Sequence, residues 1–228
     1  SSVTFWPNML KSSAILLASC CFVAVAQAQG FSFSGEEAKE RNAEAAENNQ
    51  RDAYVQYELA TPCRKAIRNQ KILVLVGENT HGTVSAKQGA FGEHVDAINK
   101  RLQSLGLRTF SPAQIRQQVA QAEIDAYFRN DPDAALSAAR KMAAQYTLRG
   151  VIASRAERNP MINVNQVSVR MDFTLTDASG KPVATANATN QSYAGSDTSG
   201  MALTLIDERA DEVVAKLYGD YCRNSRVR

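Results

Sequence analysis

The amino-acid sequence predicts an α/β (α+β) sandwich, built on a mixed β-sheet that ends in an antiparallel meander. Residues 72–76 form a short continuous apolar run bounded by Gly77, which is typical of a strand buried on both faces. Apolar residues alternate strictly over residues 167–175, which predicts a strand with one buried and one wet face. A closing helix is indicated by an apolar stripe at helical spacing, formed by Leu203, Ile206, Ala210, Val213, Val214 and Leu217.

Three helices are predicted between the first strand and the meander. Apolar residues after Ala86 recur every three or four positions until Gly106, which ends the first helix. Ser111–Pro112 and Asp131–Pro132 each place a capping side chain before a proline at the first helical position, so each pair marks another helix start. We therefore expect helices over residues 86–104, 112–127 and 132–145.

The remaining strands are predicted from alternation and turn residues. A hairpin turn is expected at residues 177–182, because this segment combines Asp, Gly and Pro between two alternating stretches. The closing helix is expected to run to about Tyr221. The predicted order is β-α-β-α-α-β-β-β-α, with strands at residues 72–76, 107–110, 146–156, 167–176 and 183–193.

Composition limits the function classes. The 228 residues carry a net charge of +3 and are 7% aromatic, so neither a basic nucleic-acid groove nor a base-stacking platform is predicted. There are two histidines, which is little material for a zinc site or a catalytic triad. We predict no nucleic-acid partner, no cofactor and no metal.

The first 28 residues are predicted to be a secretory signal peptide. Lys11 precedes an apolar run over residues 14–26, and Ala26–Gln27–Ala28 matches the small-x-small pattern cleaved by signal peptidase. A run of this length spans about 20 Å as a helix, which is too short for the roughly 30 Å of bilayer hydrocarbon, so no transmembrane span is predicted. Residues 1–8 are expected to precede the true start at Met9.

A lipoprotein signal is the alternative for the same segment. Residues 17–20 (Leu-Ala-Ser-Cys) fit a lipobox, in which Cys20 would be lipidated. The short distance from Met9 and the apolar residues after Cys20 favour cleavage after Ala28. Both alternatives predict export, either to the periplasm or, with Cys20 lipidated, to the outer membrane.

Cys63 and Cys222 are the two cysteines expected in the exported chain, and they predict a disulfide. An even number of cysteines in an oxidising compartment favours pairing. This bridge would close a loop of 159 residues and contribute on the order of 5 kcal/mol in the chain-entropy model. Two separate buried thiols are the alternative.

The predicted globular domain covers residues 63–222 and has a segment on either side. Residues 29–62 are rich in Ala and Glu, with few large apolar residues, so they are expected to be a mobile arm or a solvated helix. Residues 223–228 are a basic tail with three arginines. The tail is expected either to be solvated or to contact anionic lipid headgroups or another polyanion.

No enzyme motif is present, and no catalytic residue is predicted. Gly77 and Gly82 follow a buried strand, but they lack the Lys-Ser/Thr of a phosphate-binding loop and the glycine spacing of a dinucleotide fold. His81 stands near Glu78 in sequence with no nucleophile assigned to it, so a solvated histidine is expected. His94 lies between two core positions of a helix and is expected at the surface or its boundary.

The order of elements over residues 71–217 resembles a bacterial cell-envelope domain. It is similar to LpoB-type activators of penicillin-binding proteins, CsgG-type secretion lipoproteins, FlgT/FlgO-type flagellar assembly proteins and the N-terminal domain of TolB. The resemblance is carried by the strand at 72–76 with Asn79, Thr80 and Gly82, the strand-to-helix step at 107–112, and the stretches 138–150, 167–181 and 210–214. The chain has neither the proline-rich tether of the LpoB type nor the membrane hairpins of the CsgG type.

The resemblance implies a non-enzymatic, exported accessory protein that binds another envelope protein during assembly or activation of an envelope machine. Peptidoglycan and the outer-membrane surface are further candidate partners. The alternative is a periplasmic protein that binds, or hydrolyses, a small ligand or glycan at the loop after the first strand. Because loops on a rigid sheet commonly carry recognition, the residues expected to face a partner are Glu78, Asn79, Thr80, His81, Gly82, Arg155, Arg158 and Asn159, in the loops 78–83 and 155–160.

Overall fold

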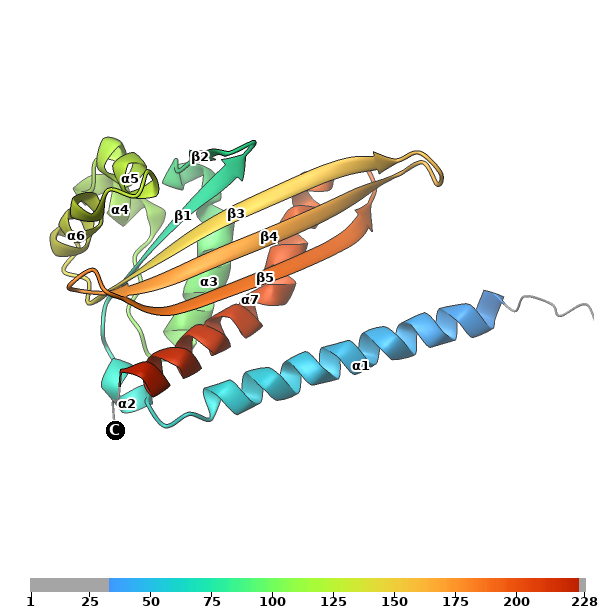
Figure 1. Ribbon diagram of the computed structural model, residues 1–228, viewed down its shortest axis with the longest axis horizontal. Coiled ribbons are helices and arrows are strands. Elements are labelled where there is room, and N and C mark those ends of the chain that lie inside the picture. The colour runs from blue at the N-terminus through green and yellow to red at the C-terminus, as the bar shows by residue number, and fades with distance from the viewer. Residues whose placement is uncertain (1–32, 226–228) are drawn as a thin grey trace, which may run out of the picture. The chain divides into compact units, whose positions relative to one another are not determined.

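The computed structural model describes residues 33–225 and contains helices packed on a five-stranded sheet (Figure 1). Strands lie in the order β2-β1-β3-β4-β5; β1 is parallel to β3, and the other neighbouring pairs are antiparallel. The predicted α+β class, with a mixed sheet and an antiparallel C-terminal meander, is therefore confirmed. The strands are Ile72–Thr80 (β1), Thr83–Ser85 (β2), Tyr146–Asn159 (β3), Val164–Asp177 (β4) and Pro182–Ala194 (β5).

The α-helices within residues 33–225 are α1 (Phe33–Leu59), α2 (Arg64–Ile67), α3 (Gly92–Ser104), α4 (Pro112–Gln118), α5 (Gln121–Phe128), α6 (Pro132–Lys141) and α7 (Thr198–Asn224). A 3-10 helix, η1 (Gln88–Phe91), comes directly before α3. None of them is long and apolar enough to cross a lipid bilayer. The chain divides into two units, residues 1–42 and 43–228, and the division falls within α1. The predicted signal peptide with Cys20, and the last three residues of the predicted basic tail, lie outside the described residues.

Two apolar clusters cover the two faces of β1. Successive side chains of a strand point to opposite faces. Ile72, Val74 and Val76 pack with residues of α3 and α7, whereas Leu73 and Leu75 pack with residues of α4, α5 and α6. All five side chains are at most 2% exposed. The prediction that this strand is buried on both faces is therefore confirmed.

The meander β3–β4–β5 buries one face against α7. The buried side chains of β5 here are the alanines Ala184, Ala186 and Ala188, whose small size lets the helix approach the sheet closely. The other face of the meander carries mainly polar and charged side chains. The alternation predicted for β4 is present, with five buried side chains from Val167, Val169, Met171, Phe173 and Leu175.

Two predicted helices have different bounds in the structure. The helix predicted over 112–127 is two helices, because Val119 is extended (φ −117°, ψ 122°) and 2% exposed. The helix predicted over 132–145 ends at Lys141, and Ala143 follows with a φ of 52°. The strand predicted at 107–110 is reduced to a single bridge between Lys71 and Arg108.

The first predicted helix begins later than expected, because Gln88 is used to cover the edge of β1. Its side chain is 1% exposed and pairs with the backbone of Val76 as a neighbouring strand would. Oε1 accepts from the Val76 N–H at 3.1 Å, and Nε2 donates to the Val76 carbonyl at 2.8 Å. Nε2 also donates to the Ala86 carbonyl at 2.8 Å. Buried backbone groups need hydrogen-bond partners, and at this edge of the sheet the amide side chain of Gln88 takes the place of a further strand.

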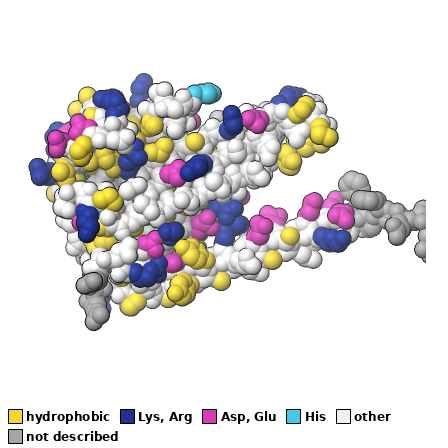
Figure 2. Space-filling view, viewed as in Figure 1, with side chains coloured by type: hydrophobic (Ala, Val, Ile, Leu, Met, Phe, Trp, Pro, Cys, Tyr) yellow, Lys and Arg dark blue, Asp and Glu magenta, His cyan; other side chains and the backbone are white. Residues whose placement is uncertain are grey.

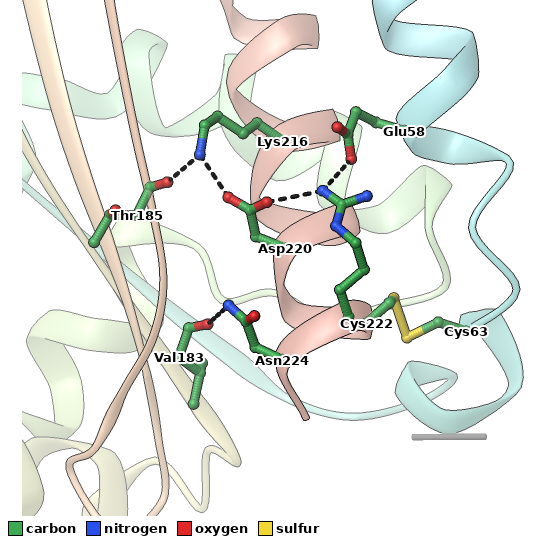
Figure 3. Close-up of polar contacts among 9 residues, drawn as sticks. Glu58, Cys63, Val183, Thr185, Lys216, Asp220, Cys222 and Asn224 are labelled. Atoms are coloured by element: carbon green, nitrogen blue, oxygen red, sulfur yellow. Dashed lines mark hydrogen bonds and ion pairs between the residues drawn. A yellow bond between two sulfur atoms is a disulfide. The ribbon is translucent and has the colours of Figure 1, made fainter. Parts of the chain in front are cut away.

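A disulfide joins Cys63, just before α2, to Cys222 near the end of α7 (Figure 3). The S–S distance is 2.16 Å, and this is the pairing predicted from the sequence. Both cysteines are buried, with exposures of 5% and 6%. The Tyr218 hydroxyl lies beside the bridge, where it donates to the Thr61 carbonyl and accepts from the Cys63 N–H at 3.3 Å. The bridge therefore fixes the start of the domain to its last helix.

An ion-pair network lies next to the disulfide, at the residue that follows Cys222. Arg223 donates to Glu58 of α1 and to Asp220 of α7, each at 2.8 Å, and Lys216 donates to Asp220 at 2.5 Å. The Glu58 carboxylate lies over Gly219, where a Cβ would stand 1.6 Å from its Oε2, so a larger residue would displace it. We call the disulfide with Glu58, Asp220 and Arg223 the C-terminal clasp.

Two side chains of α7 next to the clasp also cap carbonyls at the start of the outer edge of β5. Lys216 Nζ donates to the Thr185 carbonyl at 3.0 Å, and Asn224 Nδ2 donates to the Val183 carbonyl at 3.4 Å (Figure 3). Arg223 and Asn224, predicted to begin a basic tail, thus belong to α7 and make contacts within the domain. An edge strand with capped carbonyls is a poorer template for unwanted strand pairing.

Removal of the disulfide should lower the stability of the domain strongly. For the double variant Cys63→Ala, Cys222→Ala, the 159-residue separation predicts a loss of about 5 kcal/mol in the chain-entropy model. Urea unfolding with and without reductant measures it. Reductant should shift the wild-type midpoint and leave the double variant unchanged. A wild-type midpoint that ignores reductant would contradict a stabilising bridge.

Asp220 should make the stability depend on pH. Burial opposes its ionisation, but hydrogen bonds from Lys216 and Arg223 outweigh burial and lower the pKa of Asp220. A lowered folded-state pKa stabilises the fold above the unfolded value of about 3.9, and this contribution is lost as the pH falls through the folded pKa. Asp220→Asn should therefore be less stable than wild type at pH 7, with a smaller difference in acid.

Unfolding free energies measured across this pH range test the expectation. Asp96→Asn is the matched control, since Asp96 is exposed on α3 and should show no such pH-dependent difference. A difference between Asp220→Asn and wild type that is the same at every pH would contradict the assigned role.

Candidate functional site

The segment predicted as the loop 78–83 is a β-hairpin. Glu78, Asn79 and Thr80 extend β1 and pair with residues 83–85 of β2. His81 and Gly82 form the turn, with φ of 53° and 85°. Positive φ at both central residues is typical of the type I′ turns that favour two-residue hairpins. The sequence analysis did not predict β2, because this strand is only Thr83–Ser85 and two of its three side chains are polar.

The segment predicted as the loop 155–160 is also mostly strand, and this prediction needs the same correction. β3 continues to Asn159 and pairs with β4 as far as Asn159 opposite Val164. The charged residues in this stretch are exposed and lie beyond the buried core, so strand pairing here does not need apolar alternation. Only residues 160–163 form the connecting turn.

Parts of the two predicted segments line one open hollow of about 1150 Å³, which contains Asn79, Thr80, His81 and Arg155. The other predicted residues, Glu78, Gly82, Arg158 and Asn159, are not in its lining. The β1–β2 turn contributes residues 79–81, and β3 contributes residues 153–157. Neighbouring parts of β4 and β5, together with Arg209 of α7, complete most of the lining. Residues more than 70 positions apart in the sequence are thus brought together by the parallel pairing of β1 with β3.

The open edge of β3 borders this hollow. β1 pairs with β3 only as far as Glu78 opposite Ile152, while β3 runs on to Asn159. In an antiparallel ladder, alternate residues turn both their N–H and C=O groups away from the partner strand. Within residues 33–225 no further strand pairs with residues 153–159 on that side. Backbone donors and acceptors are therefore exposed along this edge.

Charged pairs line the face of the meander beside the hollow. Arg155 pairs with Glu157 at 3.1 Å, and Arg170 pairs with Asp172 at 3.0 Å. All four side chains are at least 49% exposed, so each pair contributes little to stability. Alternating charges of this kind suit recognition of another polar surface more than self-association of exposed strands.

Three of the predicted partner-facing residues make side-chain hydrogen bonds that stabilise turns. Asn79 Oδ1 accepts from the Gly82 N–H at 2.9 Å. Asn159 Oδ1 accepts from the Met161 N–H at 2.9 Å, and Arg158 Nε donates to Asn163 Oδ1 at 2.8 Å. Glu78 Oε1 accepts a long hydrogen bond of 3.5 Å from Ser154 Oγ, which links β1 to β3. The exposed predicted residues of the hollow are Thr80, His81 and Arg155.

Within residues 33–225, no hydrogen bond joins either histidine to a carboxylate or to a serine hydroxyl. His81 is exposed in the turn, and no hydrogen bond within residues 33–225 joins it to Ser154 or Ser168, the serines of the hollow. His94 is half-buried on α3 against the edge of Phe91, and burial lowers its pKa. Within the same residues, no three His, Cys, Asp or Glu side chains gather closely enough to hold a metal ion.

The sequence prediction missed the apolar turn between β3 and β4. Met161 is 91% exposed and Ile162 is 54% exposed. Two adjacent apolar residues between Asn159–Pro160 and Asn163 were the available signal, but a pair this short shows no periodicity. Tyr193 on β5, 56% exposed, was likewise not singled out.

Comparison with known proteins gives structural matches only. No protein-family model and no curated protein sequence matches the chain. A hypothetical protein from Chlamydia trachomatis matches at 15% identity and a TM-score of 0.47, over 68% of this chain and 99% of that one. A lipoprotein from Neisseria meningitidis matches at 15% identity and a TM-score of 0.42, over 59% and 93% of the two chains.

The LpoB C-terminal domain from Escherichia coli, one of the types that the sequence resembles, also matches. Its identity is 13% and its TM-score 0.31, over 54% of this chain and 84% of that one. Because these scores are below 0.5, no function is transferred from these proteins. The resemblance to the CsgG, FlgT/FlgO and TolB types stays a prediction.

Gly82→Ala tests whether the hairpin turn is formed as described. The φ of 85° at Gly82 disfavours a side chain, and nothing lies within 4 Å of the added Cβ, so the effect is backbone strain alone. We expect a loss of about 1 kcal/mol in unfolding free energy.

Gly92→Ala is the matched control. Its Cβ also meets nothing within 4 Å, but Gly92 has a helical φ of −52°. Alanine there should be neutral or stabilise by up to about 1 kcal/mol. Equal effects of the two substitutions on urea unfolding would contradict the turn.

Proposed function

We propose that this protein is an exported accessory protein that binds another envelope protein, in the assembly or activation of an envelope machine. The hollow between the β1–β2 turn and the outer part of β3 is the proposed binding site. The proposal rests on one observation above all: residues 79–81 and 155–157, which belong to the two segments that the sequence marks for recognition, line the same hollow.

The open edge of β3 supports a protein partner. Proteins often bind extended segments of a partner by adding them as a strand to an exposed sheet edge. Residues 153–159 offer such an edge, and the hollow beside it has room for side chains of the added segment. Arg155 and Glu157 would set the register by charge, because rim charges contribute more to specificity than to affinity.

The shape of the hollow disfavours the alternative of a small ligand. Pockets for small molecules are typically enclosed, of about 300–1,000 Å³, and lined mainly by apolar side chains. This hollow is larger and open, and its lining is more polar than apolar, with Asn79, His81, Ser154 and Arg209 among its residues. An extended segment of a partner protein fits these features better than a buried ligand does.

The disulfide supports the proposed export. Disulfides persist in oxidising compartments, and this one joins two buried cysteines that are far apart in the sequence. The periplasm is therefore the proposed location, as the predicted signal peptide also indicates. Lipidation at Cys20 would place the same domain at the outer membrane.

Site-specific photocrosslinking in living cells tests the proposal. A photoreactive residue at Ala156, an exposed position of the hollow, should give a discrete adduct with another envelope protein. The same residue at Arg116, exposed on α4, is the control and should give none. Equal labelling at both positions, or no adduct from Ala156, would refute the site.

A filled hollow should lower the yield of the adduct. With the photoreactive residue placed at Ser154, which is exposed in the same hollow, Ala156→Arg should lower the yield about tenfold, because a bulky charge would oppose docking by at least about 1.4 kcal/mol. Ala113→Arg, at an exposed position of α4, should leave the yield unchanged. Thermal unfolding of both variants checks that each remains folded.

A further inference from the structure

The β3–β4 hairpin ends in exposed apolar side chains, which the function proposed above does not use. Met161 and Ile162 are 91% and 54% exposed. Figure 2 shows hydrophobic side chains gathered at the end of this hairpin, and Figure 1 shows that the hairpin extends past the end of β5. We call residues 160–163 the hairpin tip.

Hydrogen bonds within the hairpin tip and with Asn159 pair several backbone groups of the tip. The Asn163 N–H donates to the Asn159 carbonyl at 2.9 Å, and the Met161 N–H donates to Asn159 Oδ1 at 2.9 Å. Asn163 adopts a left-handed φ of 54°, which closes the turn. Polar backbone groups enter an apolar medium only when paired, so this pairing suits the tip to leave water.

The cation closest to the tip is not neutralised. Arg155 and Arg170 pair with Glu157 and Asp172, whereas the guanidinium of Arg158 donates to the neutral side chain of Asn163. No carboxylate of residues 33–225 lies within 4 Å of Arg158. Its charge is held directly behind the apolar side chains.

An exposed tyrosine stands behind the same tip. Tyr193 of β5 lies opposite Gln166 of β4 and is 56% exposed. Tyrosine is enriched at the headgroup level of membranes, because its ring is apolar and its hydroxyl is polar. The hairpin thus presents apolar side chains first, then a cation, then an aromatic hydroxyl.

We propose that the hairpin tip inserts shallowly into the surface of an anionic lipid bilayer. Met161 and Ile162 enter the boundary of the acyl chains, Arg158 binds lipid phosphate, and Tyr193 lies among the headgroups. The unneutralised cation behind a convex apolar tip favours lipid over an apolar pocket of a protein. This proposal is independent of protein binding at the hollow.

The contact is expected to be weak and reversible. A single myristoyl chain gives only marginal membrane binding, and the two side chains of the tip bury less apolar surface. The tip therefore orients the domain at the membrane without anchoring it.

A tryptophan at the tip reports insertion. Ile162→Trp is prepared in the exported protein, and Tyr57→Trp is the matched control at an exposed residue of α1. Phosphatidylglycerol-containing vesicles with brominated acyl chains should quench and blue-shift the fluorescence of Ile162→Trp but not that of Tyr57→Trp. Vesicles of phosphatidylcholine alone should give a smaller effect.

The proposal would be overturned if folded Ile162→Trp protein showed no quenching. It would also be overturned if Ile162→Trp and Tyr57→Trp were quenched equally. A photoreactive residue at Ile162 that labels an envelope protein, without quenching by vesicles, would assign the tip to a protein pocket and would equally overturn it.

Substitutions separate the apolar and charged contributions. Met161→Ser with Ile162→Ser should lower vesicle cosedimentation at least tenfold. Arg158→Gln should lower it only on anionic vesicles, and Arg158→Lys should restore it. Unfolding midpoints check that each variant remains folded. Unchanged cosedimentation of the folded double variant would contradict insertion.

Discussion

The pairing of β3 with β4 is the interaction on which the candidate site depends. The ladder is unbroken from Tyr146 opposite Asp177 to Asn159 opposite Val164, whereas β1 accompanies β3 only as far as Ile152. This difference in length leaves an open edge on β3 beside the β1–β2 turn. It also carries the apolar turn past the end of β5. A shorter ladder would remove both the hollow and the exposed tip.

The C-terminal clasp and Gln88 hold the body of the domain in place around this ladder. The disulfide and the pair Glu58–Arg223 fix the end of α1 and the start of the domain to α7, which packs under β4 and β5. Gln88 makes hydrogen bonds to the backbone of β1 at Val76, where β2 does not pair with it. These contacts hold the sheet in place, and we propose that the exposed hairpin carries recognition.

Most of the fold could be predicted from the sequence, because burial produces a pattern. The apolar run at 72–76, the alternation over 167–175 and the proline-capped helix starts at 112 and 132 all correspond to observed elements. The cysteine count predicted the Cys63–Cys222 bridge. Segments outside the core were predicted less well. Residues 83–85 and 157–159 are short strand segments held by backbone pairing, and most of their side chains are polar, so they carry little apolar signal. The tip was missed because two exposed apolar residues have no periodicity.

Hydrogen exchange of the outer ladder tests this account most directly. The amides in residues 153–158 and 165–170 that point between β3 and β4 should exchange slowly, although neither β1 nor α4–α6 covers them, because the ladder itself protects them. The alternate amides of β3 on its open edge should exchange fast in the same molecule. Exchange of all these amides at the rate of an unstructured peptide would show that the outer hairpin is not formed, and neither the hollow nor the tip would then exist as described.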